Sequence, residues 1–151
     1  MKSIYSIHTP LGMLHAEEED GRVTAVHLPG LPHPAPEGKP QTDLARELDE
    51  YFAGKRKHFD VPLGFDGAPF QMKALLAART VPYGGTTTYA ALAAAAGNPR
   101  AARAAGRAMA TNPLPILIPC HRVLYSNGKK QQYAGGPEMK DFLLALEQRH
   151  R

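Results

Sequence analysis

The sequence predicts an α/β (α+β) fold in which a small β-sheet and one helix come first and a largely helical half follows. Three observations predict this class: short alternating apolar segments before residue 28, alanine-rich segments with helical periodicity after residue 69, and a seam with glycine and proline at 64–69. We therefore expect two domains, 1–65 and 66–151. The chain has 151 residues, of which 43% are hydrophobic, so the two domains can share one core.

The first 28 residues are expected to form a β-meander. Alternating segments over 3–8 and 13–16 flank a turn signal at 9–12. A third strand is expected from Val23, after the turn at Asp20-Gly21.

Between this meander and the seam, the pattern predicts a loop, a helix and a strand. Residues 29–40 contain five prolines and two glycines, which is typical of a loop. Apolar residues recur at helical spacing over 43–52, and Gly54 is a favourable stop for that helix. Residues 55–62 are expected to form a short edge strand that carries basic side chains.

The second half predicts four helices. Thr88 is a favourable N-cap for the second of them and Gly97 a favourable stop, whereas Asn98 and Pro99 suit the N-cap and first position of the third. Because only a Gly-Asn turn separates the second and third helices, the pair is a helix-turn-helix candidate. The four helices are expected over 70–81, 89–96, 99–110 and 138–149.

The segment 115–124 is an apolar run that contains the only cysteine, Cys120. The run is too short for a typical helix, so we expect buried extended chain. A hairpin-type turn at 126–129 and a loop at 133–137 are expected to connect it to the last helix.

Charge is distributed unevenly along the chain. The formal net charge is +4, yet residues 71–137 contain no Asp or Glu at all. This distribution favours a face that meets a polyanion such as nucleic acid, although a domain with merely uneven charge is the alternative. No apolar run is long enough to span a membrane, and no signal peptide is evident, so we expect a cytoplasmic protein without a membrane partner.

The predicted helix 99–110 presents mostly alanine and glycine. A helix that reads base edges in the major groove needs several long polar side chains, which this one lacks. A small-residue surface suits close approach in a minor groove, with Arg103 entering the duplex. The alternative is a small-residue helix packed in the core, but Arg100, Arg103 and Arg107 argue against full burial.

Cys120 is either an inert core thiol or a nucleophile. Its neighbour His121 could act as a base, through a bridging water because adjacent side chains in extended chain point apart. Glu147 lies beside the apolar stripe of the last helix and could orient His121; pairing with Lys140 or Arg149 at the surface is the alternative. These three roles would also suit a cysteine hydrolase.

The segment Pro119-Cys120-His121-Arg122-Val123 resembles the active-site signature of the O6-alkylguanine-DNA alkyltransferases, also called methylated-DNA–protein-cysteine methyltransferases. The agreement is specific over 69–150, and it is general over 1–65. The further matching segments, in the family's order and spacing, are Tyr89, 97–104, 112–113, 115–118, Tyr133 with 135–136, and 143–144 with Glu147. The resemblance implies a ribonuclease-H-like first domain and a winged-helix-like second domain with a helix-turn-helix.

The resemblance also implies a function: DNA repair by irreversible, single-turnover transfer of an alkyl group from O6-alkylguanine to Cys120 after nucleotide flipping. His121 would be the water-linked base and Glu147 the residue that orients it. Asn112 would be a hinge, Tyr89 a donor to guanine N3, and Arg103 the finger that replaces the flipped nucleotide. Further implied DNA contacts are Thr88, Ala101, Ala102, Ala104, Gly106 and Arg107, and the implied base pocket comprises Met109, Val123, Tyr133, Ala134 and Gly135.

The implied partner is double-stranded DNA containing O6-alkylguanine, bound through its minor groove by a monomer with little sequence specificity. No cofactor is implied and no structural zinc is expected, because a single cysteine and scattered histidines provide no ligand set. The resemblance admits O4-alkylthymine as a second substrate.

Three positions depart from the family pattern, namely Gly85, Arg107 and Ala134. Ala134 stands where a serine is common, so only its backbone N–H could bond the guanine O6. A winged-helix DNA-binding or lesion-sensing protein with an unreactive cysteine is the alternative function.

Overall fold

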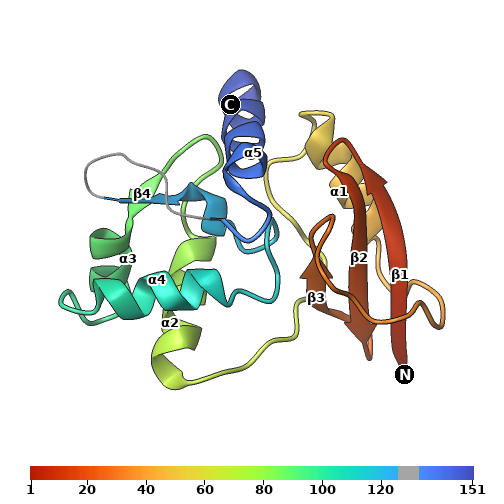
Figure 1. Cartoon of the computed structure of the whole chain (residues 1–151), viewed down its shortest axis with the longest axis horizontal. Helices are drawn as coiled ribbons and strands as arrows, with labels where there is room; N and C mark the ends of the chain where they lie inside the picture. Colours follow the sequence, from red (N-terminus) through yellow and green to blue (C-terminus); the bar gives the residue numbers. More distant parts are fainter. Residues whose placement is uncertain (126–132) are drawn as a thin grey trace.

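The computed structural model describes residues 1–125 and 133–151 (Figure 1). It has the predicted mixed class. In Figure 1 the N-terminal sheet and α1 (Leu44–Phe52) lie on one side, and α5 (Pro137–His150) stands in the middle. The other side holds α2 (Pro69–Arg79), α3 (Tyr89–Ala95) and α4 (Ala102–Ala110). The predicted turn at 126–129 lies outside the described residues.

The N-terminal sheet is antiparallel, in the order β1 (Lys2–Thr9), β2 (Gly12–Glu19), β3 (Arg22–His27). The predicted meander is confirmed, but β2 is longer than expected because it includes the acidic residues up to Glu19. One of them, Glu18, is fully buried and accepts hydrogen bonds from Tyr5 and Thr42, which explains how a carboxylate is tolerated there.

The helix α1 (Leu44–Phe52) ends as predicted at Gly54, whose φ of +77° favours glycine. A Cβ at this position would lie 2.1 Å from the His150 ring, so the glycine also lets the end of α1 approach the end of α5. Leu44, Leu48 and Tyr51 on α1 are fully buried and belong to a core that both halves of the chain share.

The predicted edge strand at 55–62 is wrong. The backbone N–H groups of Asp60 and Val61 donate to the buried carboxylate of Glu47 and therefore do not join a neighbouring strand. Arg56 is tied to Glu50 and Asp60 by side-chain ion pairs. The chain reaches the sheet only at the end of this segment, where the Val23 N–H donates to the Pro62 carbonyl at 2.9 Å and Leu63 forms an isolated bridge with Val23.

The second half contains α2 (Pro69–Arg79), β4 (Thr87–Thr88), α3 (Tyr89–Ala95) and α4 (Ala102–Ala110). It continues with a 3-10 helix, η1 (Cys120–Arg122), then β5 (Val123–Leu124) and α5 (Pro137–His150). The short strands β4 and β5 pair in parallel. The N-cap prediction for α3 is confirmed, since Thr88 Oγ1 accepts a hydrogen bond from the N–H of Ala91 at 3.0 Å.

The predicted start of the third helix is wrong by three residues, because α4 begins at Ala102 and not at Pro99. Asn98 Oδ1 accepts from the N–H of Arg100, and the Asn98 carbonyl accepts from the N–H of Ala101. Asn98 therefore stabilises a tight turn ahead of the helix, a role that asparagine fulfils as readily as helix capping.

The prediction of extended chain at 115–124 is also wrong. The segment folds into successive turns, with Ile118 N–H bonded to Leu114 O at 2.8 Å and Arg122 N–H bonded to Pro119 O at 3.0 Å. Ile116 adopts a φ of +74°, which is uncommon for a β-branched residue. Cys120 thus begins a buried 3-10 turn, and only Val123 and Leu124 are strand.

No helix among the described residues is long and apolar enough to cross a membrane.

Candidate active site

Cys120 occupies the first position of η1 and is 7% exposed. Asn112 supports the turn that leads to it: its Nδ2 donates to the Ile118 carbonyl at 2.9 Å, and its Oδ1 accepts from the Leu114 N–H at 2.9 Å. Burial raises the pKa of the Cys120 thiol, while a hydrogen bond from Asn112 and the charge of Lys140 oppose that rise. Because its pKa is raised, the thiol rests protonated and needs a base to react.

His121 is completely buried, and its Nε2 lies 2.7 Å from Oε2 of Glu147. Burial lowers the pKa of His121, although the hydrogen bond and charge of Glu147 oppose that shift. The neutral tautomer that fits this contact carries its proton on Nε2, so Nδ1 has the free lone pair. Nδ1 has no hydrogen-bond partner among the described residues, which leaves it able to accept a proton.

Glu147 is 1% exposed and receives hydrogen bonds from three side chains. Arg122 donates through Nε to Oε1 at 2.8 Å and through Nη2 to Oε2 at 3.0 Å, and the Tyr51 hydroxyl donates to Oε2 at 2.6 Å. Burial alone would raise the pKa of Glu147, but the bonds from His121 and Arg122 lower it to about 2. Of the two interpretations of Glu147, the structure therefore has the buried one, in which it contacts His121.

Lys140 is a further buried charge, 1% exposed, whose Nζ donates to the Val123 carbonyl at 2.9 Å. Lys140 is therefore not the surface partner of Glu147 that the sequence offers as an alternative. A signal was present, however, because Lys140 and Glu147 are seven residues apart and share one face of α5 with the fully buried Leu143.

A cavity of about 20 Å³ adjoins Cys120, which is room for a single water molecule. Met109, Tyr133 and Ala134 line it as the resemblance implied, and Tyr89 lines it too. Val123 and Gly135 do not line it: Val123 is fully buried, and Gly135 packs against Met139. The lining residues that were not expected there are Gly106, Ala110 and Lys140.

A larger open depression of about 460 Å³ lies outside this cavity, and Tyr89, Gly106 and Ala110 line both. Its volume is in the range that accommodates a ligand larger than a single base. Arg103 and Arg107, one turn apart on α4, line it and are exposed. The exposed Tyr125 stands at its edge, with its ring centroid 5.7 Å from that of Tyr89.

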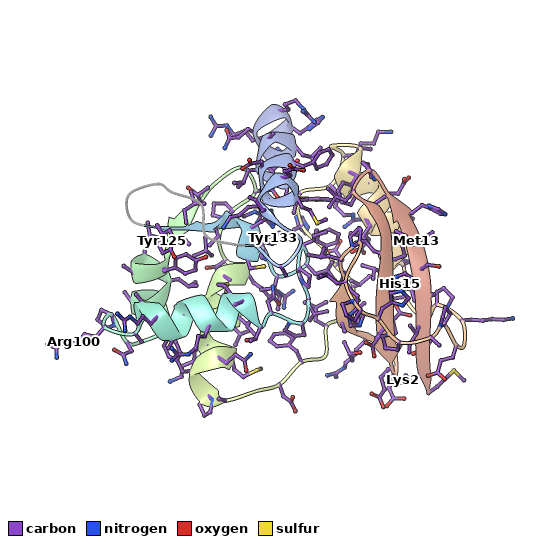
Figure 2. All side chains as sticks on the ribbon, in the orientation of Figure 1. Lys2, Met13, His15, Arg100, Tyr125 and Tyr133 are labelled. Atoms are coloured by element: carbon purple, nitrogen blue, oxygen red, sulfur yellow. The ribbon has the colours of Figure 1, made fainter. Side chains whose placement is uncertain are left out.

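The buried side of α4 consists of Ala105, Ala108 and Met109, so the helix is amphipathic and not wholly buried. Figure 2 shows Arg100 projecting outward from the turn before α4, while Tyr133 lies near the centre of the molecule. Three other implied DNA contacts lie on or beside this helix, since Ala102 lines the depression and Ala101 and Ala104 are half-buried. Thr88 lies elsewhere, as the N-cap of α3.

Among the described residues, no group of three or more His, Cys, Asp or Glu side chains could hold a metal ion.

Comparison with known proteins assigns the two halves separately. Residues 69–149 match the family model of the 6-O-methylguanine DNA methyltransferase DNA-binding domain, and residues 4–65 match that of the ribonuclease-like domain of the same proteins.

Relatives and solved structures agree with these matches. The constitutive methylated-DNA–protein-cysteine methyltransferase of Bacillus subtilis is 43% identical over 92% of this chain and 91% of its own length. The methylated-DNA–protein-cysteine methyltransferase of Methanosarcina acetivorans is 48% identical over 70% of this chain and 67% of its own length. The O6-methylguanine methyltransferase of Mycobacterium tuberculosis superposes with a TM-score of 0.92 at 34% identity, covering 100% of this chain and 95% of that one.

A crystal structure of the M. tuberculosis protein in complex with DNA gives a TM-score of 0.90 at 35% identity, over 96% of this chain and 92% of that one. Both halves, matched over nearly the whole chain, place this protein in the 6-O-methylguanine DNA methyltransferase family.

Proposed function

We propose that this protein repairs DNA by moving an alkyl group from O6 of guanine to Sγ of Cys120, once per molecule. The observation that carries the proposal is the position of Cys120. It lies at the floor of a cavity that shares its lining with the depression beside Arg103, and the His121–Glu147 pair lies next to it in the interior.

The reaction begins with a proton transfer from the Cys120 thiol to Nδ1 of His121, through a bridging water. Burial keeps both groups neutral at rest, and the anionic Glu147 stabilises the imidazolium that forms. The charge of Lys140 favours the thiolate. Sγ then attacks the alkyl carbon, an S–C bond forms, and the bond between that carbon and O6 breaks.

The electron pair of the broken bond stays on guanine, so negative charge develops on the base. Tyr89 lines the cavity, and burial raises its pKa, which keeps its hydroxyl protonated and able to donate to guanine N3. The proton that left Cys120 finally resides on the guanine. The thioether is stable, so each molecule is consumed by one reaction.

The damaged base must leave the DNA double helix, because a nucleophile buried in a protein cavity cannot reach O6 within a stacked base pair. The small residues of α4 allow close approach to the minor groove, and Arg103 takes the place of the flipped nucleotide. The cavity of about 20 Å³ is too small for a base, so its lining must move apart when the base enters. The proposal places the protein in the cytoplasm, as a monomer that binds duplex DNA with little sequence preference.

The proposal is tested by incubating the protein with a duplex that contains O6-methylguanine, followed by intact-mass and peptide-mass measurement. We expect the gain of one methyl group on Cys120 and a reaction that stops at one equivalent. The Cys120→Ala variant and an undamaged duplex are the matched controls. An unchanged mass after incubation of the native protein would overturn the proposal.

The same experiment separates the alternative function, a lesion-binding protein with an unreactive cysteine. That protein would bind the modified duplex equally well with Cys120 or alanine and would never gain mass. A cysteine hydrolase would turn over many equivalents of an ester or peptide.

A further inference from the structure

Tyr51 connects the N-terminal domain to the reactive groups. It lies in the last turn of α1, is completely buried, and donates its hydroxyl proton to Oε2 of Glu147 at 2.6 Å. The same oxygen faces Nε2 of His121 at 2.7 Å. Tyr51 and Glu147 are 96 residues apart in the chain, so this contact exists only because the two domains pack together.

The hydroxyl of Tyr51 acts as a fixed donor. Burial raises the pKa of Tyr51 far above its ordinary value, and the charge of Glu147 raises it further, so the phenol stays protonated. Its ring is held in place on two sides: the Phe59 centroid lies 5.4 Å away and the Tyr83 centroid 6.2 Å away. Tyr83 in turn faces the guanidinium of Arg122 at 5.7 Å.

Several charged and titratable groups surround the His121–Glu147 pair. These groups come from five parts of the chain: Tyr51 from α1, Tyr83 from the turn before β4, Cys120 and Arg122 from η1, Tyr133 from the loop before α5, and Lys140 from α5. Within this group, Oε2 of Glu147 has three donors, namely Tyr51, His121 and Arg122 Nη2. Each donor reduces the electron density that the oxygen offers to the others, so the Tyr51 bond limits how strongly Glu147 attracts the His121 proton.

We propose that Tyr51 is a positioning residue through which the N-terminal domain orients Glu147 and His121 for the reaction at Cys120. This inference rests on the proposed function. It assigns the N-terminal domain a part in the chemistry that goes beyond support of the fold.

The test compares Tyr51→Phe with a matched control, Tyr5→Phe, in the full-length protein. The Tyr5 hydroxyl also donates to a glutamate, Glu18, at 2.9 Å within the same domain, but it contacts none of the groups around His121. For each protein, the single-turnover rate with O6-benzylguanine is measured across the range in which histidine titrates, roughly pH 5 to 9.

We expect Tyr51→Phe to react about tenfold more slowly at neutral pH, because a hydrogen bond to a charged group is lost and the position of Glu147 is fixed by one donor fewer. A carboxylate with fewer donors stabilises the imidazolium more strongly, so the pKa of His121 should rise. Because protonated His121 cannot accept the thiol proton, the acidic limb of the rate profile should move to higher pH. An NMR titration of His121 should show the same upward shift. Tyr5→Phe should keep the rate and the acidic limb of the unmodified protein.

A rate and profile for Tyr51→Phe that match the unmodified protein would overturn the inference. So would a loss of rate with an unmoved acidic limb and an unmoved His121 titration, because this result would indicate a purely structural role. If Tyr51→Phe does not fold, 3-fluorotyrosine at position 51 keeps the ring and donates more strongly. The acidic limb should then move to lower pH, and an unmoved limb would count against the inference. If the protein without any substitution accepts no alkyl group, the proposed function itself is wrong.

Discussion

Arg122 and Glu147 form a buried ion pair with two points of contact, Nε to Oε1 at 2.8 Å and Nη2 to Oε2 at 3.0 Å. The third nitrogen of the same guanidinium, Nη1, donates to the Val81 carbonyl at 2.7 Å. Arg122 follows Cys120 by two residues and belongs to the same turn. Its bonds to Glu147 therefore attach that turn to α5, and its bond to Val81 attaches it to the chain after α2. Such a fork of parallel hydrogen bonds requires arginine and cannot be reproduced by lysine.

The first prediction concerns the stability of this pair. Arg122→Met should lower the free energy of unfolding by about 3–5 kcal/mol, because it leaves the Glu147 charge buried with fewer partners. Urea denaturation measures the change. The matched control is Arg46→Met, whose ion pairs with Asp43 and Glu50 lie at the surface, where solvent screening makes their contribution small, so this variant should lose much less stability. Equal losses in the two variants would contradict the assignment of Arg122 as a buried partner.

The second prediction concerns acid stability. The pKa of Glu147 is lowered from 4.5 to about 2 in the folded protein, so the folded state favours the ionised form. This group therefore contributes up to about 3 kcal/mol of stability above about pH 4.5, and the contribution is lost as the pH falls from 4.5 towards 2. Unfolding free energies of the native protein and Glu147→Gln should thus converge over this interval. The control is Glu37→Gln at an exposed position of the N-terminal half, and a constant difference for Glu147→Gln would refute the shift.

The third prediction concerns Asn112, which bonds backbone groups on both sides of the turn before Cys120. Asn112→Ala should cost about 1–3 kcal/mol of stability for each backbone group that is left buried and unbonded. It should also raise the pKa of the Cys120 thiol, because the hydrogen bond from Asn112 opposes the effect of burial. Thiol alkylation followed as a function of pH measures this pKa. If the pH of half-maximal alkylation is not higher in Asn112→Ala than in the native protein, Asn112 acts only on the fold.

The fourth prediction separates two arginines on α4. Arg103→Ala should slow repair of duplex DNA far more than reaction with free O6-benzylguanine. Only in the duplex does a flipped nucleotide leave a gap that Arg103 has to fill. Arg107→Ala should instead weaken binding to all duplexes similarly and reduce the slope of log affinity against log salt by about one, as for the loss of a phosphate contact. Equal losses on both substrates for Arg103→Ala would argue against a finger.

Elements whose signals are local could be predicted well. Thr88 caps α3, Gly97 follows its end with a φ of +96°, and α5 closes the chain within a residue of its expected bounds. These predictions succeed because capping and backbone conformation depend on neighbours in the chain. The errors arose where one residue type serves two local structures, as at Asn98, or where buried carboxylates capture backbone donors, as Glu47 does at Asp60 and Val61.

Residue types and their spacing along the chain predicted the class of fold, the acid-free segment 71–137, and the family signature that contains Cys120 and His121. Each of these is a local pattern that depends on neighbouring residues. Which distant side chains meet at Glu147 depends instead on how the elements pack in the folded chain. Tyr51 and Arg122 contact Glu147 because a buried carboxylate must be bonded, and the packing of α1 and η1 against α5 determines which donors are within reach.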